Sequence, residues 1–394
     1  MLKPVNVDMP NGTTHRISAL DGVRGYAAVV VLVWHAILGC DWDGLTKIIS
    51  TPIQAVPHNL IWSKFWMTVF NGESAVVIFF LLSGCVLTQS AAKETERFGV
   101  VRSFVAFSVR RVLRVFPAVI VCVVACSALL GVEKYFGLYL GVLDVRAVVG
   151  NTLLLGTQIV GSTWTLQVEM AAVPFILVGG WALARYGYIG PLLFLFFSLV
   201  AYKLPMLALN YKLLSMYLFY LGIGALIPTE LGAYSGRIAD RIGAPVLILG
   251  FIFVRMFLPA ALIGLLLQAS FGYLFLCLLV YVKPTKLTTF LNTPVSQFLG
   301  KVSFGFYLWN VFFLLLIWGV RPVYNPPIFK DYAIEFGLII GAILVLPSLA
   351  IAAFSERYVE RPFIDMGRAV SDRIFGRAPI ASQTQVTSSV AKIA

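Results

Sequence analysis

Residues 19–36 read ALDGVRGYAAVVVLVWHA, an apolar run that keeps Arg24 near its start and His35 near its end. A run this apolar belongs in lipid or in a protein core, where ionisable groups are costly to bury. Eleven residues turn a helix by about 1100°, which is three full turns and about 20° more. Arg24 and His35 therefore share one helix face, about 16 Å apart along the axis.

The composition is that of a protein that crosses a membrane several times. Its 394 residues are 59% hydrophobic and 12% charged, whereas soluble domains carry about 25% charged residues. Ten apolar segments are long enough, or nearly so, to cross a hydrocarbon core of about 30 Å. They are residues 22–40, 67–89, 112–132, 165–184, 188–203, 212–229, 244–258, 260–282, 303–320 and 333–354. We expect an all-α polytopic membrane protein of about ten transmembrane helices, with the count open by one around 244–282.

The basic residues predict the orientation. With ten crossings both termini lie on one side, and about two thirds of the 30 Lys and Arg residues fall on that side. Lys and Arg concentrate in cytoplasmic loops, so both termini are expected in the cytoplasm. Basic residues in cytoplasmic loops account for the net charge of +12, so the charge does not imply a nucleic-acid partner. We divide the chain into a polar N-terminal tail (1–17), a transmembrane domain (18–364) and a disordered cytoplasmic tail (365–394).

The cysteines predict no metal site. None of their spacings is that of a metal-binding motif, and all of them lie in or beside apolar segments. Packing as small apolar side chains accounts for them. They are Cys40, Cys85, Cys122, Cys126 and Cys277.

One group of polar residues is expected toward the outer side of the membrane. His35 lies deep in the first segment, where burial keeps an imidazole neutral and able to accept a proton. Glu73 precedes the second segment, and Glu169 lies a little way into the fourth, which enters from outside. Trp164 is placed to stack on a sugar ring or to lie in an aromatic belt at the interface. The alternative for His35 is an ordinary buried histidine that is hydrogen-bonded to a neighbouring helix.

A second polar group is expected on the cytoplasmic side. Residues 108–117 read SVRRVLRVFP, and Arg110, Arg111 and Arg114 fall within little more than one helical turn. Guanidinium groups at the start of a helix form a phosphate site, because the helix dipole already favours anions there. The alternative is an ordinary cluster of positive residues that anchors the helix. Interfacial anchoring is also the alternative for Arg24.

Six segments in order resemble the acyltransferase-3 family of integral membrane acyltransferases. The resemblance covers residues 17–363, and the first segment carries Arg24 and His35 at the family's Arg-x10-His spacing. Two positions depart from the family pattern: Cys85 stands where Phe is usual, and Asn310 stands where many members have His. The segments are LDGVRGYAAVVVLVWHA (20–36), AVVIFFLLSGCVLT (75–88), RRVLRVFPA (110–118), STWTLQVEM (162–170), GKVSFGFYLWN (300–310) and ERPF (360–363).

The resemblance implies transfer of an acyl group, usually acetyl, from acyl-CoA to a hydroxyl group. The implied donor is cytoplasmic acetyl-CoA, and the implied acceptor is a carbohydrate or glycolipid of a cell-surface or secreted glycan. Such a chain would lie in the lipid of a bacterial cytoplasmic (inner) membrane and would use no metal. The sequence leaves open the acceptor, the acyl length, the oligomeric state, and the choice between direct transfer and an acyl-enzyme.

The resemblance also implies roles for individual residues. Arg111 and Arg114, with Arg110 beside them, would hold the CoA phosphates. His35 would be the general base or a transient acyl carrier, and Arg24 would structure the channel.

Glu169 would orient His35 or the acceptor. The developing oxyanion needs a donor, for which Ser83, Trp164 and Asn310 are candidates. Glu73 and Trp164 are the candidates for contacting the acceptor.

Two other functions fit the same residues. A transporter or flippase for a glycan or polyol would also use two polar centres on opposite sides of a membrane. A non-catalytic scaffold in an envelope polysaccharide complex would need neither centre.

Overall fold

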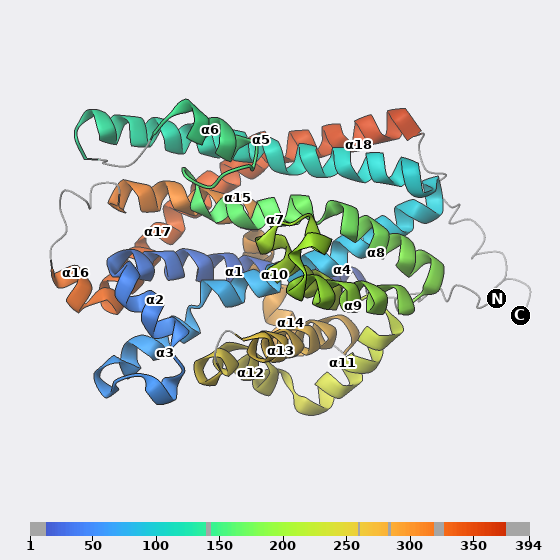
Figure 1. The fold of residues 1–394 in the computed structure, drawn as a ribbon, viewed down its shortest axis with the longest axis horizontal. Coiled ribbons are helices and arrows are strands. Elements are labelled where there is room, and N and C mark those ends of the chain that lie inside the picture. The colour runs from blue at the N-terminus through green and yellow to red at the C-terminus, as the bar shows by residue number, and fades with distance from the viewer. Residues whose placement is uncertain (1–12, 139–142, 259–260, 283–284, 319–326, 376–394) are drawn as a thin grey trace, which may run out of the picture.

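The computed structural model describes residues 13–138, 143–258, 261–282, 285–318 and 327–375. Within these residues every regular element is helical, as the apolar segments predict (Figure 1). The helices are α1 (Thr13–Cys40), α2 (Trp42–Ser50), α3 (Ile61–Val69), α4 (Gly72–Phe98), α5 (Val100–Tyr135), α6 (Val145–Thr152), α7 (Trp164–Ala171), α8 (Val173–Tyr186), α9 (Ile189–Lys203), α10 (Lys212–Ala225), α11 (Glu230–Ile242), α12 (Ala244–Phe257), α13 (Leu262–Tyr281), α14 (Lys286–Leu291), α15 (Pro294–Trp318), α16 (Ile328–Asp331), α17 (Ala333–Ser355) and α18 (Arg361–Phe375).

Between six and eight spans satisfy the length and apolarity needed to cross a membrane, among the residues described. Six are continuous: Ser18–Cys40, His58–Phe98, Val100–Tyr135, Leu262–Tyr281, Pro294–Trp318 and Ala333–Ile374. Two more arise if each bent pair, α7 with α8 and α10 with α11, is one span. The shorter apolar helices α9 and α12 coincide with the two remaining predicted segments. The chain is therefore an all-α integral membrane protein, while the count of ten stays a prediction.

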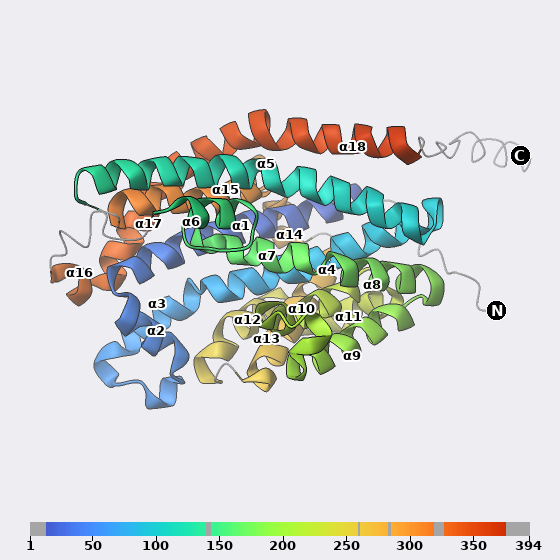
Figure 2. The same ribbon diagram turned by 45° about the horizontal axis from the view of Figure 1, so that its top comes forward.

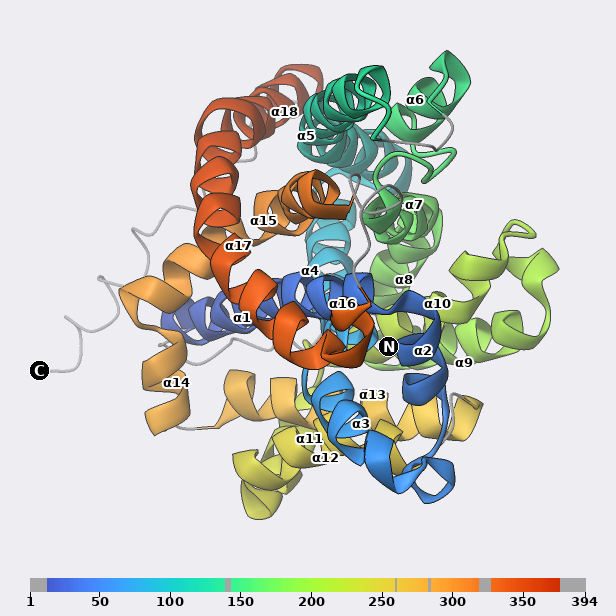
Figure 3. The ribbon, with the colours of Figure 1, turned by 90° about the vertical axis from the view of Figure 1, so that its left-hand side faces the viewer.

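Helix α1 lies at the centre of the bundle. It packs against α15 and α17 on one side and against α4 on the other (Figure 3). Helices α8 and α10 pack against α4, α7 and α9 pack against α8 and α10, and α11 to α13 form a further group next to them. Helix α1 is thereby packed on several sides, and both Arg24 and His35 are partly buried.

The first and last helices define the two ends of the bundle. The start of α1 and the end of α18 lie at the end where α4 turns into α5, opposite to α2, α3 and α16 (Figure 2). Helix α18 runs along α5, where Gly367 lies against the backbone of Arg110. Residues 365–375, expected in the disordered tail, are helical instead, while the domain boundary itself stays a prediction. The rest of the predicted tail, from 376 on, lies outside the described residues.

Glycines allow α1 and α15 to approach each other closely. A Cβ atom on Gly25 would lie 2.7 Å from the backbone nitrogen of Gly300, well inside van der Waals contact. A Cβ atom on Gly300 would collide in turn with the backbone of Asp21. Since the backbone itself occupies this space, a larger residue must push the two helices apart.

We predict that Gly25→Ala lowers the thermal stability of the detergent-solubilised protein, with a loss of about 1–3 kcal/mol from overpacking. The control is Gly131→Ala on α5, where the nearest atom to the new Cβ would be a Leu143 side-chain carbon at 3.8 Å. That change should cost nothing, because alanine favours a helix over glycine by about 1 kcal/mol. Equal melting temperatures for the two variants would contradict this helix contact.

Candidate active site

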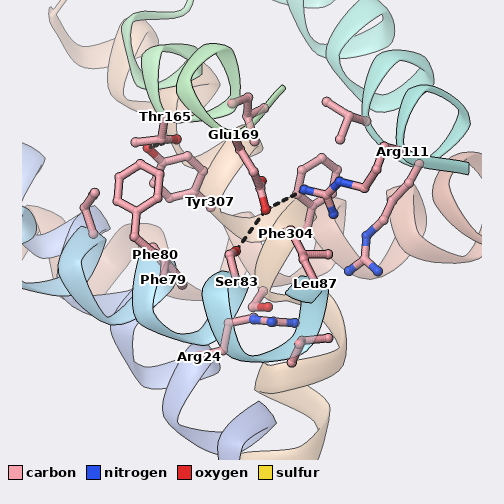
Figure 4. A pocket seen from close by; sticks show the side chains of 16 residues that line it. Arg24, Phe79, Phe80, Ser83, Leu87, Arg111, Thr165, Glu169, Phe304 and Tyr307 are labelled. Carbon is pink, nitrogen blue, oxygen red and sulfur yellow. Dashed lines mark hydrogen bonds and ion pairs between the residues drawn. The ribbon is translucent and has the colours of Figure 1, made fainter. Parts of the chain in front are cut away.

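A buried ion pair joins three helices in the interior. Nη2 of Arg111 on α5 lies 2.5 Å from Oε1 of Glu169 on α7. The same oxygen accepts a hydrogen bond of 2.9 Å from the hydroxyl of Ser83 on α4 (Figure 4). Charge-assisted hydrogen bonds of this kind are about twice as strong as neutral ones. The three side chains therefore fix α4, α5 and α7 relative to one another.

Glu169 reaches this depth because the chain enters the bundle before α7 begins. Ile159 and Val160 are buried although they lie in no helix, and Asn151 satisfies their backbone. The Asn151 side chain accepts from both of their N–H groups, at 3.1 and 2.7 Å, and donates to the Thr163 hydroxyl at 2.8 Å. Helix α7 then runs at 42° to α8. Glu169 consequently meets the arginines of α5.

A pocket of about 130 Å³ surrounds the ion pair and has two unlike ends. One end carries the guanidinium groups of Arg24, Arg111 and Arg114. The other end is aromatic, with Phe79 and Phe80 from α4 and Tyr307 from α15 (Figure 4). The remaining lining residues are Val76, Ser83, Val86, Leu87, Val115, Thr165, Leu166, Glu169, Ser303 and Phe304.

The charged end has unused capacity to bind an anion. Arg114 is exposed and lines the pocket, and it forms no ion pair or hydrogen bond with any residue the structure describes. The Nε–H of buried Arg111 likewise has no acceptor among those residues. Arg24 lies 3.8 Å from the half-exposed Asp21, a distance at which the pair is weak. Guanidinium N–H groups without a strong acceptor can donate hydrogen bonds to the oxygens of a phosphate.

Glu360 lies beside the site, although it is not among the residues that line the pocket. It lies in the π-helical turn Glu356–Glu360 between α17 and α18, and its side chain is buried. It accepts a hydrogen bond of 3.2 Å from Ser355 and is close enough to Arg114 for their charges to interact. Gly305 leaves room for it, since a Cβ there would lie 2.6 Å from a Glu360 carboxylate oxygen. The sequence signal for this residue is the ERPF segment (360–363). Its Glu points inward because the helix widens at the π-helical turn.

His35 stands apart from the ion pair. It is half-buried, it is not among the residues that line the pocket, and its Nδ1 lies 2.9 Å from the carbonyl oxygen of Val31. A carbonyl can only accept, so Nδ1 carries the hydrogen, and when the ring is neutral Nε2 holds a lone pair. Glu169 is bonded to Arg111 and Ser83, so the expectation that it orients His35 or the acceptor stays a prediction.

Two other candidates are engaged elsewhere. Arg110 forms an ion pair with Glu94 on α4 and donates to the Ser371 hydroxyl on α18 at 2.8 Å. It therefore ties α18 to the turn between α4 and α5 and does not line the pocket. Glu73 is exposed and lies 3.8 Å from the guanidinium of Arg255 on α12.

The remaining candidates lie near the aromatic end. The Trp164 ring packs against Phe80, with 6.4 Å between centroids, and against Tyr217 at 4.9 Å. Asn310 is fully buried and donates to the backbone oxygen of Tyr307 at 3.0 Å, while its own side-chain oxygen has no partner among the described residues. The described residues hold no group of three or more His, Cys, Asp or Glu side chains placed to bind a metal ion.

Comparison with known proteins gives one match. A family model, Acyl_transf_3, described as an acyltransferase domain, matches residues 17–354. No curated protein and no solved structure matches the chain.

The ion pair yields a prediction about stability. Glu169→Gln should lower the free energy of unfolding by about 3–5 kcal/mol, because it leaves the buried Arg111 uncompensated. Asp365→Asn is the matched control, since Asp365 and Arg368 form an exposed pair at 3.3 Å whose loss should not be measurable. Melting curves in detergent compare the two. A similar small loss for both variants would show that the buried pair does not hold the helices together.

Proposed function

The chain belongs to the acyltransferase-3 family and is a membrane acyltransferase, and we propose that it moves an acetyl group from acetyl-CoA to a sugar hydroxyl. The acceptor is a carbohydrate or glycolipid of a cell-surface or secreted glycan. The observation that carries this proposal is the unpaired Arg114 beside Arg111 and Arg24 in one pocket. An anionic donor such as acyl-CoA carries phosphates that accept hydrogen bonds from these guanidinium groups.

The orientation follows from the same proposal. The start of α1 and the end of α18, with the charged end of the pocket toward them, face the cytoplasm, where acyl-CoA is found. The bundle then crosses a bacterial cytoplasmic membrane ten times, with α9 and α12 as its two shortest spans. Glu73 and Trp164 lie in the half of the bundle that faces the acceptor.

His35 is proposed as the general base. Its Nε2 removes the proton of the acceptor hydroxyl while the hydroxyl oxygen attacks the carbonyl carbon of the thioester. The new C–O bond forms, the C–S bond breaks, and the CoA thiolate leaves and takes up the proton. The Nδ1–H bond to Val31 holds the ring in the tautomer that this step requires.

Arg24, Arg110, Glu169 and the oxyanion candidates have subordinate roles. Arg24 completes the cationic end of the pocket, and Glu169 keeps Arg111 in place through their ion pair. Arg110 acts at a distance, by holding α18 against α5. Ser83 and Asn310 remain candidates for stabilising the oxyanion, and Trp164 for contact with the sugar. Ser83 would have to release Glu169 to do so.

The reaction is tested by supplying labelled acetyl-CoA to the cytoplasmic side of membranes that contain the chain. Label should appear on glycan or glycolipid, and His35→Ala should reduce it at least a thousandfold, because the base is lost. Binding of acetyl-CoA should stay within twofold of native. Equal labelling by both proteins, each present and folded, would remove His35 as the catalyst.

Arg114→Gln tests donor binding separately. It should raise the KM for acetyl-CoA at least tenfold, because a hydrogen bond to a charged group contributes about 1.5–3 kcal/mol. The native fold should persist, since Arg114 forms no ion pair with the described residues. Arg368→Gln, an exposed position on α18, should leave the KM unchanged. Identical KM values for the two variants would exclude the arginine pocket as the donor site.

A further inference from the structure

The two centres needed for acyl transfer are separated in this structure. The charged end of the pocket includes Arg24, while His35 lies about 16 Å farther along the same face of α1. Ala28 and Val31 occupy that face between them, one and two turns beyond Arg24. The thioester of a donor whose phosphates lie at Arg24 must therefore travel along this stripe to reach Nε2 of His35.

Aromatic side chains close the pocket in that direction. Phe79 lies one helical turn from Ser83 on α4, on the side away from Leu87, and it meets the Tyr307 ring edge-on with 5.6 Å between centroids. Phe79 also packs against the apolar cluster that α1, α15 and α17 form, which contains Ala28 and Leu32 of α1. It therefore contacts both the pocket and a cluster to which the helix that carries His35 contributes.

The two rings differ in how firmly they are held. The Tyr307 hydroxyl donates to the backbone oxygen of Ser162 at 2.9 Å and accepts from the Thr165 hydroxyl at 2.9 Å. Phe79 is half-buried and is held only by apolar contacts. The two apolar clusters against which it packs include the small side chains of Ala27 and Ala28. Tyr307 is thus fixed by two hydrogen bonds, whereas no hydrogen bond restrains rotation of the Phe79 ring.

We propose that Phe79 is a gate between the arginine pocket and His35, and that the pantetheine arm of the donor passes between Phe79 and Tyr307. The proposal rests on the proposed function, since it assigns the donor's arm to this passage. The Phe79 and Tyr307 rings are in contact, 5.6 Å between centroids, so the Phe79 ring moves aside when the arm passes between them. In the closed state the ring keeps water at the charged end from reaching His35.

Changes in the size of the ring test the gate in the full-length chain reconstituted in nanodiscs. Phe79→Trp should lower acetyl transfer at least tenfold while the Kd for acetyl-CoA stays within twofold, because the arginines are untouched. Phe79→Ala should raise hydrolysis of acetyl-CoA to acetate and free CoA in the absence of acceptor, because water then reaches the thioester at His35. Phe313→Ala is the matched control, since Phe313 is a half-buried ring against the same α1 cluster but outside the pocket. Native transfer by Phe79→Trp, or loss of donor binding in step with transfer, would overturn the gate.

A second measurement needs no enzymatic activity. The variant His35→Cys is labelled in inside-out vesicles with a small membrane-impermeant thiol reagent. Labelling of the same chains with His35 retained gives the background. Adding Phe79→Ala should speed labelling about tenfold, and adding Phe313→Ala should not. Equal rates would overturn the gate. Faster labelling together with an inactive native chain would support the barrier and reject the proposed function.

Discussion

The ion pair between Glu169 and Arg111 is the interaction on which the interior depends. In a bundle covered by lipid, an uncompensated charge costs several kcal/mol, so each partner must stay beside the other. Ser83 adds α4 to the contact between α5 and α7. Arg114 lies one turn farther along α5 and is left without an ion partner among the described residues. The pair thus builds a rigid cationic pocket in which one guanidinium group remains free for a substrate.

The sequence predicted the helices and the family but not the way in which the polar residues meet. Apolar length and charge composition determine a membrane helix, so all ten predicted segments coincide with helices. Residue spacing shows which side chains share a face of one helix, as for Arg24 and His35. It does not show which helices face each other. The local sequence therefore does not predict the contact of Glu169 with Arg111, because nothing in it indicates that Ile159 and Val160 are buried outside a helix.

The sequence also fails to predict the positions of α18 and Glu360, again because both depend on contacts between distant helices. Residues beyond 365 look like a polar tail, yet Gly367 and Ser371 give α18 a narrow buried face against α5. Glu360 looks like surface charge, yet a widened helical turn carries it toward Arg114. In both cases the decisive contact is with α5, which is far away in the chain, and only tertiary packing reveals it.

The central claim is that the arginine pocket receives the donor's phosphates and directs its thioester past Phe79 toward His35. The most direct test is an experimental structure of the chain bound to a non-hydrolysable acetyl-CoA analogue. The account predicts the diphosphate against Arg111 and Arg114, with the acetyl group beyond the Phe79 ring and near Nε2 of His35. A diphosphate seated instead in the separate surface pocket of Lys301, Arg357 and Arg361, with the arginine pocket unchanged, would contradict it.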